Sequence, residues 1–127
     1  MVQLRDLNQQ INDLGFQILA ISPDQPSKVR ETIGEHKINF TLLSDSQMAA
    51  AHAFRIAYKV DDATLKALGQ HGIDLEGASG ETHHELPVPA VFLARSDLVI
   101  QFEYVNPDYS VRVHPELLLA AARLAHK

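Results

Sequence analysis

The sequence contains no cysteine and no tryptophan among its 127 residues. Without cysteine, the chain has no disulfide, thiolate nucleophile, CxxC redox pair or cysteine-ligated metal. It also lacks a long uninterrupted apolar run, so we expect no membrane partner. The net charge of −5 argues against a nucleic-acid partner. The polar N-terminus does not resemble a signal peptide, so we expect a cytoplasmic protein.

Apolar spacing predicts an alternation of helices and strands. Leu4, Leu7 and Ile11 recur at helical spacing and predict an amphipathic helix that begins almost at Met1 and ends at Gly15. Residues 59–85 predict an irregular insert, with one short helix capped by Asp61 or Asp62. The elements expected between these segments are a strand over 16–22, a helix from 26 to about 36, a strand over 40–43, and a helix over 48–54 that opens on a capping box at 44–47.

The C-terminal part predicts a β-hairpin and a closing helix. Residues 90–94 are apolar throughout, as in a strand buried on both faces, and residues 98–103 alternate with one wholly apolar face. Pro89 stands at the entry to the first strand, where its missing amide is not needed. Pro115 opens the last helix, with an apolar stripe at Leu117, Leu118, Ala121 and Leu124. Together these elements predict a single α/β domain over residues 1–127.

Several runs of residues follow one another in a familiar order: LGFQILAISPD at 14–24, FTLLSD at 40–45, VPAVFL at 88–93 and NPDY at 106–109. They resemble segments of the peroxiredoxin-like proteins of the alkyl hydroperoxide reductase/thiol-specific antioxidant (AhpC/TSA, redoxin) family. The resemblance implies a thioredoxin-like fold, here truncated, with a central β-sheet flanked by helices and ending in a β-hairpin and a C-terminal helix. It also implies a cis peptide bond before Pro89.

The same resemblance implies thiol-dependent reduction of hydroperoxides, with a thiol reductant as partner and no metal or organic cofactor. In the family the catalytic cysteine lies in a loop just before the segment that residues 2–7 match. We therefore expect an N-terminally incomplete domain in which no residue is catalytic or binds a cofactor. The chain itself should not reduce hydroperoxides. The alternative is a non-catalytic binding or regulatory module that acts through protein association.

The resemblance further implies that one strand of the sheet is absent. It would lie between the strand at 16–22 and the strand at 90–94. Unpaired strand edges seek partners. The two strands could pair directly, a second subunit could fill the place, or the chain could be a marginally stable fragment. We expect a homodimer.

A divalent-metal site in a cysteine-free enzyme is a further alternative. His83, His84 and Glu85 are the weak candidate ligands, with His71 or His114 arriving from elsewhere. Neighbouring side chains in an extended segment point to opposite sides, which favours a polar surface loop instead. We therefore assign no metal to these residues.

Asp24 and Asp45 each follow a predicted strand, at the end of the strand where α/β sheets place their ligands. Two such carboxylates could act as a general acid and a general base. Turn formation and helix capping suit both residues equally well, and we favour that interpretation.

Overall fold

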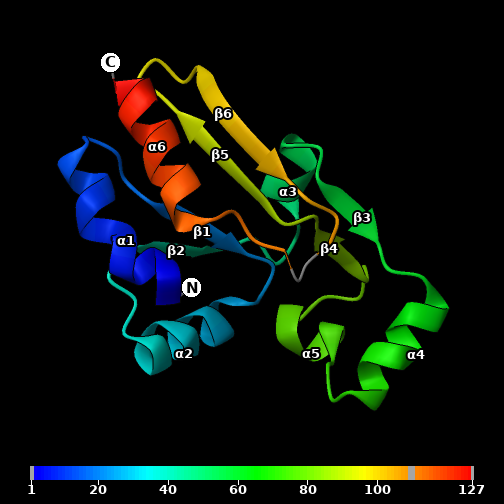
Figure 1. The fold of residues 1–127 in the computed structure, drawn as a ribbon. Coiled ribbons are helices and arrows are strands. Elements are labelled where there is room, and N and C mark those ends of the chain that lie inside the picture. The colour runs from blue at the N-terminus through cyan, green and yellow to red at the C-terminus, as the bar shows by residue number, and fades with distance from the viewer. Residues whose placement is uncertain (1, 109–110, 127) are drawn as a thin grey trace.

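The computed structural model describes residues 2–108 and 111–126, and helices and strands alternate along much of it (Figure 1). Tyr109, the last residue of the NPDY run, lies outside the described residues. In chain order the elements are α1 (Val2–Asp13), β1 (Leu19–Ser22), α2 (Pro26–His36), β2 (Thr41–Ser44), α3 (Ala49–Ala53), β3 (Ala57–Lys59), α4 (Asp62–Gln70), α5 (Leu75–Ser79), β4 (Glu85–Pro87), β5 (Ala90–Ala94), β6 (Ile100–Val105) and α6 (Pro115–His126).

The strands form three two-stranded sheets. β1 pairs in parallel with β2, so that Ile21 lies opposite Leu43. β3 pairs antiparallel with β4, and β5 pairs antiparallel with β6 in the predicted hairpin. The second hairpin strand begins at Ile100 rather than at Leu98, because Leu98 belongs to the turn and has a left-handed φ of 66°.

One hydrophobic core joins two of these sheets. Its buried members come from α1, β5 and α6, and Ile18 before β1 packs against it together with Val91 and Phe102 of the hairpin. Figure 1 shows α1 and α6 on the same side of β1 and β5. Burial of these apolar side chains therefore fixes the helices over both sheets. The buried members are Leu7, Ile11, Leu93, Leu118, Leu119 and Ala122.

The C-terminal helix begins at Pro115 as predicted but buries a different face. Leu118, Leu119 and Ala122 are buried, whereas Leu117 is 46% exposed and Leu124 is 73% exposed. Both sets of positions fit a helical spacing, because the helix is apolar on most of its circumference. Packing against α1 and the hairpin selects the buried set.

The third helix begins later than its predicted capping box implies. Met48 precedes α3 in a left-handed conformation with φ 64°, and its own side chain makes no capping hydrogen bond. The Asp45 carboxylate caps the helix instead, because it accepts hydrogen bonds of 3.0 Å from the backbone N–H groups of Ala50 and Ala51. Met48 is fully buried. The helix start is therefore set by a side chain four residues before the first helical position.

The insert predicted to be irregular contains two helices, α4 and α5, and is flanked by the paired strands β3 and β4. No strand was predicted at 57–59, where β3 forms, and Tyr58 of β3 pairs with Leu86 of β4. Local spacing does not reveal a pairing between residues so far apart in the sequence. The Asp61 cap is confirmed, since its carboxylate accepts a hydrogen bond of 2.7 Å from the Thr64 backbone N–H. Asp74 caps α5 in the same way through the Gly77 N–H.

We expect the Asp61 cap to respond to acid. Hydrogen bonds from the Thr64 side chain and then from its backbone N–H lower the pKa of Asp61 below its ordinary value of 3.8. A lowered folded-state pKa contributes stability that is present above the unfolded-state pKa and is lost as the pH falls through the folded-state pKa. In an NMR titration the Thr64 amide should therefore shift with a midpoint below pH 3.8. The control is Asp61→Asn, whose neutral cap does not titrate, and a wild-type midpoint above that pH would refute the prediction.

Candidate functional site

Two strand edges face each other without pairing. In the described residues β1 is hydrogen-bonded only to β2, and β5 only to β6. Ile18 beside β1 nevertheless packs against the core that contains Leu93 of β5, so apolar contacts connect the two sheets. Figure 1 shows β1 and β5 running in opposite directions. We call the facing edges of β1 and β5 the open edges. Direct pairing of the two strands, one of the three expected outcomes, does not occur.

The β1–β2 sheet has one covered face and one open apolar face. On the covered face Leu42 is buried, together with Val29 of the neighbouring helix α2. On the other face Leu19, Ile21 and Leu43 are 57%, 47% and 45% exposed. Side chains alternate between the two faces of a strand, so these three share one face. An exposed patch of large apolar side chains beside unpaired backbone groups is typical of an association surface.

Polar side chains gather where β1 and β2 end. The Ser44 hydroxyl donates to the Asp24 carbonyl oxygen at 2.6 Å, and the Ser22 hydroxyl accepts from the Asp24 backbone N–H at 3.2 Å. The Asp45 carboxylate is occupied by its two bonds to α3. In the described part of the chain the Asp24 carboxylate has no hydrogen-bond partner. Both serines and Asp45 thus stabilise the loops, and the favoured capping role holds for Asp45.

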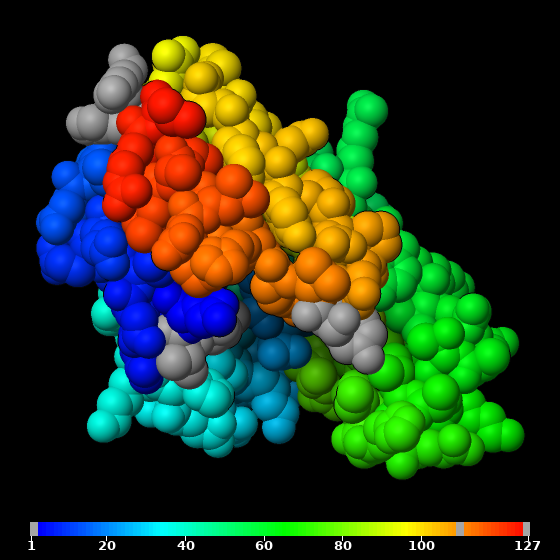
Figure 2. Space-filling model, viewed as in Figure 1, coloured from blue at the N-terminus to red at the C-terminus, as the bar shows by residue number. Residues whose placement is uncertain are grey.

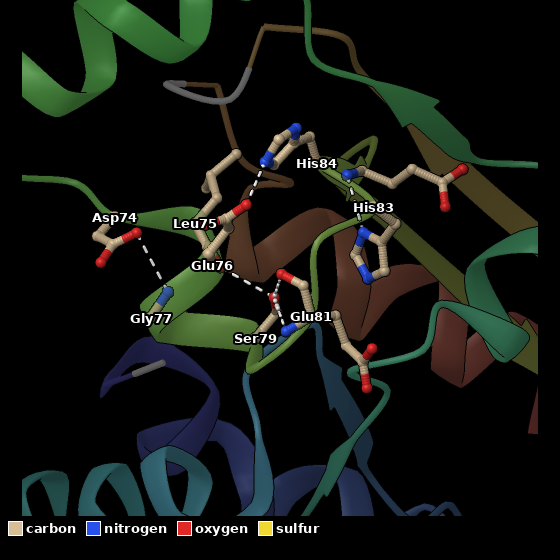
Figure 3. Close-up of polar contacts among 9 residues, drawn as sticks. Asp74, Leu75, Glu76, Gly77, Ser79, Glu81, His83 and His84 are labelled. Atoms are coloured by element: carbon tan, nitrogen blue, oxygen red, sulfur yellow. Dashed lines mark hydrogen bonds and ion pairs between the residues drawn. The ribbon is translucent and has the colours of Figure 1, made fainter.

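His83 and His84 have separate partners (Figure 3). His83 Nδ1 accepts a hydrogen bond of 2.9 Å from the Glu85 backbone N–H, so its proton lies on Nε2, which donates to the Ser46 carbonyl oxygen at 2.7 Å. His84 Nε2 lies 2.8 Å from Oε1 of Glu76. The two rings therefore act as ties to different segments of the chain.

The Glu85 side chain pairs with yet another residue, since its Oε1 lies 3.0 Å from Nε2 of His52. His114, proposed as a more distant ligand, accepts a hydrogen bond from the Glu116 backbone N–H at the start of α6. Within residues 2–108 and 111–126, no three His, Asp or Glu side chains converge in a way that could hold a metal ion. His83, His84 and Glu85 thus cross-link the segment between α5 and β4 to its neighbours.

Pro89 connects β4 to β5 through a trans bond. The cis bond expected from the family resemblance is not observed, because every peptide bond between described residues is trans. The Val88 N–H donates to the Ile56 carbonyl oxygen at 2.8 Å, and the Pro89 carbonyl oxygen accepts from the Asn106 N–H at 3.1 Å. These bonds hold residues 88–89 as a short link between β4 and β5, and a trans peptide bond before Pro89 is compatible with both of them.

A contact that the sequence did not reveal fixes the insert to the body of the protein. The Gln25 backbone N–H donates to the Ala78 carbonyl oxygen, and the Gln25 side chain donates to the Gly77 carbonyl oxygen, each at 2.8 Å. The loop between β1 and α2 is thereby attached to α5. The sequence predicted only that a helix begins at residue 26, and no local pattern indicates the partner of Gln25.

These features define the class of the protein. Parallel β1 and β2, the antiparallel β5–β6 hairpin and the helices packed across them form a thioredoxin-like α/β fold. The sequence model of the AhpC/TSA family matches residues 1–103, and the chain belongs to this family. No helix of the described residues is long and apolar enough to cross a membrane.

A curated relative supports the same family. The peroxiredoxin bcp assigned in Haemophilus influenzae is 42% identical over 53 residues, which is 42% of this chain and 34% of that protein. The matched segment thus spans about a third of the length of this relative. This chain contains no cysteine.

The two bonds of His83 predict a measurable contribution to stability. His83→Ala leaves the Ser46 carbonyl oxygen and the Glu85 N–H without partners, so it should lower the free energy of unfolding by about 1–3 kcal/mol. His71→Ala is the matched control, because His71 is exposed and only its backbone is hydrogen-bonded in the described structure. Urea denaturation of both variants measures the difference. Equal losses would show that the His83 bonds contribute nothing.

Proposed function

We propose that residues 1–127 form the scaffold of a thiol peroxidase-like protein and do not themselves reduce hydroperoxides. The absence of cysteine from a chain of this family carries the proposal. Thiol peroxidases act through a thiolate that attacks the O–O bond, which releases an alcohol and leaves a sulfenic acid. Met48 cannot replace it, because it is fully buried and its sulfoxide would need a separate reductase.

The open edges support the scaffold interpretation. An added strand that ran parallel to β1 would run antiparallel to β5, because these two strands point in opposite directions. One of its faces would meet the core of α1 and α6, and the other would lie beside Leu19 and Ile21. A strand that fits there is apolar on both faces. We propose that such a strand completes the sheet and carries the reactive thiol.

The first test is an activity assay on the isolated chain. With a hydroperoxide and dithiothreitol as reductant, the chain should show no turnover above the uncatalysed rate, because no atom in it can form a sulfenic acid. The matched control is a thiol peroxidase of the family under the same conditions. Turnover by the isolated chain would refute the proposed inactivity.

Intact mass spectrometry of the protein from its own cells tests the scaffold itself. A polypeptide or covalent complex that adds a cysteine-containing segment before Met1 would support it. A mass equal to that of residues 1–127 would reject it for the living protein and favour the second candidate.

The second candidate is a non-catalytic module that acts through association, and the open apolar face of β1 and β2 favours it. We propose a homodimer that buries Leu19, Ile21 and Leu43 between two copies. A dimer of this kind has identical patches facing each other, which an apolar patch permits without charge repulsion.

Light scattering after size exclusion tests the homodimer. The wild-type chain should have the mass of two copies, and Ile21→Glu should have the mass of one, because a charge in an apolar interface is costly to bury. Leu124→Glu is the control, since Leu124 is 73% exposed on α6, away from this face. A wild-type monomer, or dissociation by both substitutions alike, would count against the proposed interface.

A further inference from the structure

The acidic excess of the protein is confined to one segment. The whole chain has 16 acidic and 11 basic residues. Residues 61–85 contain six of the acidic residues and only one basic residue, Lys66, so the remainder of the chain has ten of each sign. The net charge of −5 is therefore accounted for by residues 61–85. The six acidic residues are Asp61, Asp62, Asp74, Glu76, Glu81 and Glu85.

The same segment projects from the body of the protein and carries a shallow, open hollow. Figure 2 shows the residues from about 60 to 85, in green, extending to one side of the molecule. Between α4 and α5 lies a hollow of about 290 Å³, which we call the α4–α5 hollow. Leu65, Ile73 and Leu75 supply its apolar lining, and Ile73 is 48% exposed. Large apolar side chains thus remain accessible within the most acidic part of the surface.

Polar residues hold this hollow in shape. His84, at φ 53°, is in the left-handed conformation, and its ring lies 2.8 Å from Oε1 of Glu76 (Figure 3). Asp74 caps α5 through one carboxylate oxygen at 3.1 Å from the Gly77 N–H. The contacts of Gln25 attach α5 to the body. In the described structure Asp74 and Glu76 each bond through a single oxygen, so the second oxygen of each carboxylate is left for a ligand.

We propose that the α4–α5 hollow docks a basic, amphipathic segment of a partner protein. A large apolar side chain of the partner would enter against Leu65 and Ile73, and neighbouring lysine or arginine side chains would pair with Asp74 and Glu76. The charge of the insert favours a cationic partner and disfavours nucleic acid and anionic lipid, because like charges repel across a surface. This surface lies apart from the open edges, so the inference does not depend on the proposed scaffold function.

Two glycines provide a matched test. A Cβ atom added at Gly69 of α4 or at Gly34 of α2 would meet nothing within 4 Å, and neither glycine has a positive φ. Only Gly69 lines the hollow. Gly69→Phe should therefore block the hollow without disturbing the fold, whereas Gly34→Phe adds the same side chain to a helix elsewhere. Thermal unfolding followed by circular dichroism confirms that both variants remain folded.

The probe is a fluorescently labelled amphipathic peptide of leucine and lysine, with its leucine–glutamate counterpart as the charge control. Fluorescence anisotropy on the full chain should show binding of the lysine peptide only, and the affinity should fall with added salt. Gly69→Phe should weaken binding by about tenfold or more, and Gly34→Phe should leave it unchanged. The double variant Asp74→Asn, Glu76→Gln keeps the cap of α5 and should also weaken binding. Amide shifts on binding should map to residues 65–84.

Three results would overturn the proposal. They are equal binding of the two peptides, unchanged binding to Gly69→Phe, and amide shifts centred on Leu19, Ile21 and Leu43. The last result would place the peptide on the open apolar face instead.

Discussion

The packing of α1 and α6 across two unjoined sheets is the interaction on which this structure depends. No hydrogen-bonded ladder links β1 to β5, so the position of one sheet relative to the other rests on apolar contacts. Leu7 and Ile11 of α1 meet Leu118 and Ala122 of α6 in that core, and Leu93 anchors the hairpin beneath them. Hydrophobic burial is not directional, so it can hold two sheets side by side without pairing their edges. The consequence is a fold that is compact on one face and open on the other, where Leu19 and Ile21 remain exposed.

The chain has the fold of its family but contains no thiol. A fold does not determine an activity, because the reaction depends on particular side chains placed on it. Here the helices, the parallel strands and the hairpin of the AhpC/TSA family are present, but no side chain can form the sulfenic acid on which thiol peroxidation depends. Ser22, Ser44 and Asp45, at the strand ends where a ligand could lie, form loop and capping bonds instead.

The insert differs from the rest of the chain in its charge and in how it is attached. It is attached to the body at few points, which include the pairing of β3 with β4, the contacts of Gln25 with α5, and the bonds of His83 and His84. Its acidic residues lie on α4 and α5, on the segments beside these helices and at the start of β4. Figure 1 shows this part of the chain projecting outward. A charged projection can bind a partner without altering the packing of the core, and charge complementarity mainly governs which partner it meets and how fast.

The sequence by itself determined the elements that depend on neighbouring residues. Proline at position 26 and at position 115 marks the first residue of a helix, an aspartate at 61 or 62 caps α4, and the apolar run at 90–94 forms β5. Family resemblance, rather than periodicity, anticipated the unpaired edges of β1 and β5. Only the tertiary structure decided the pairing of Tyr58 with Leu86, the buried face of α6, the separate partners of His83 and His84, and the trans bond at Pro89. The physical reason is that capping and helical spacing act within a few residues, whereas strand pairing and core packing join segments distant in the sequence.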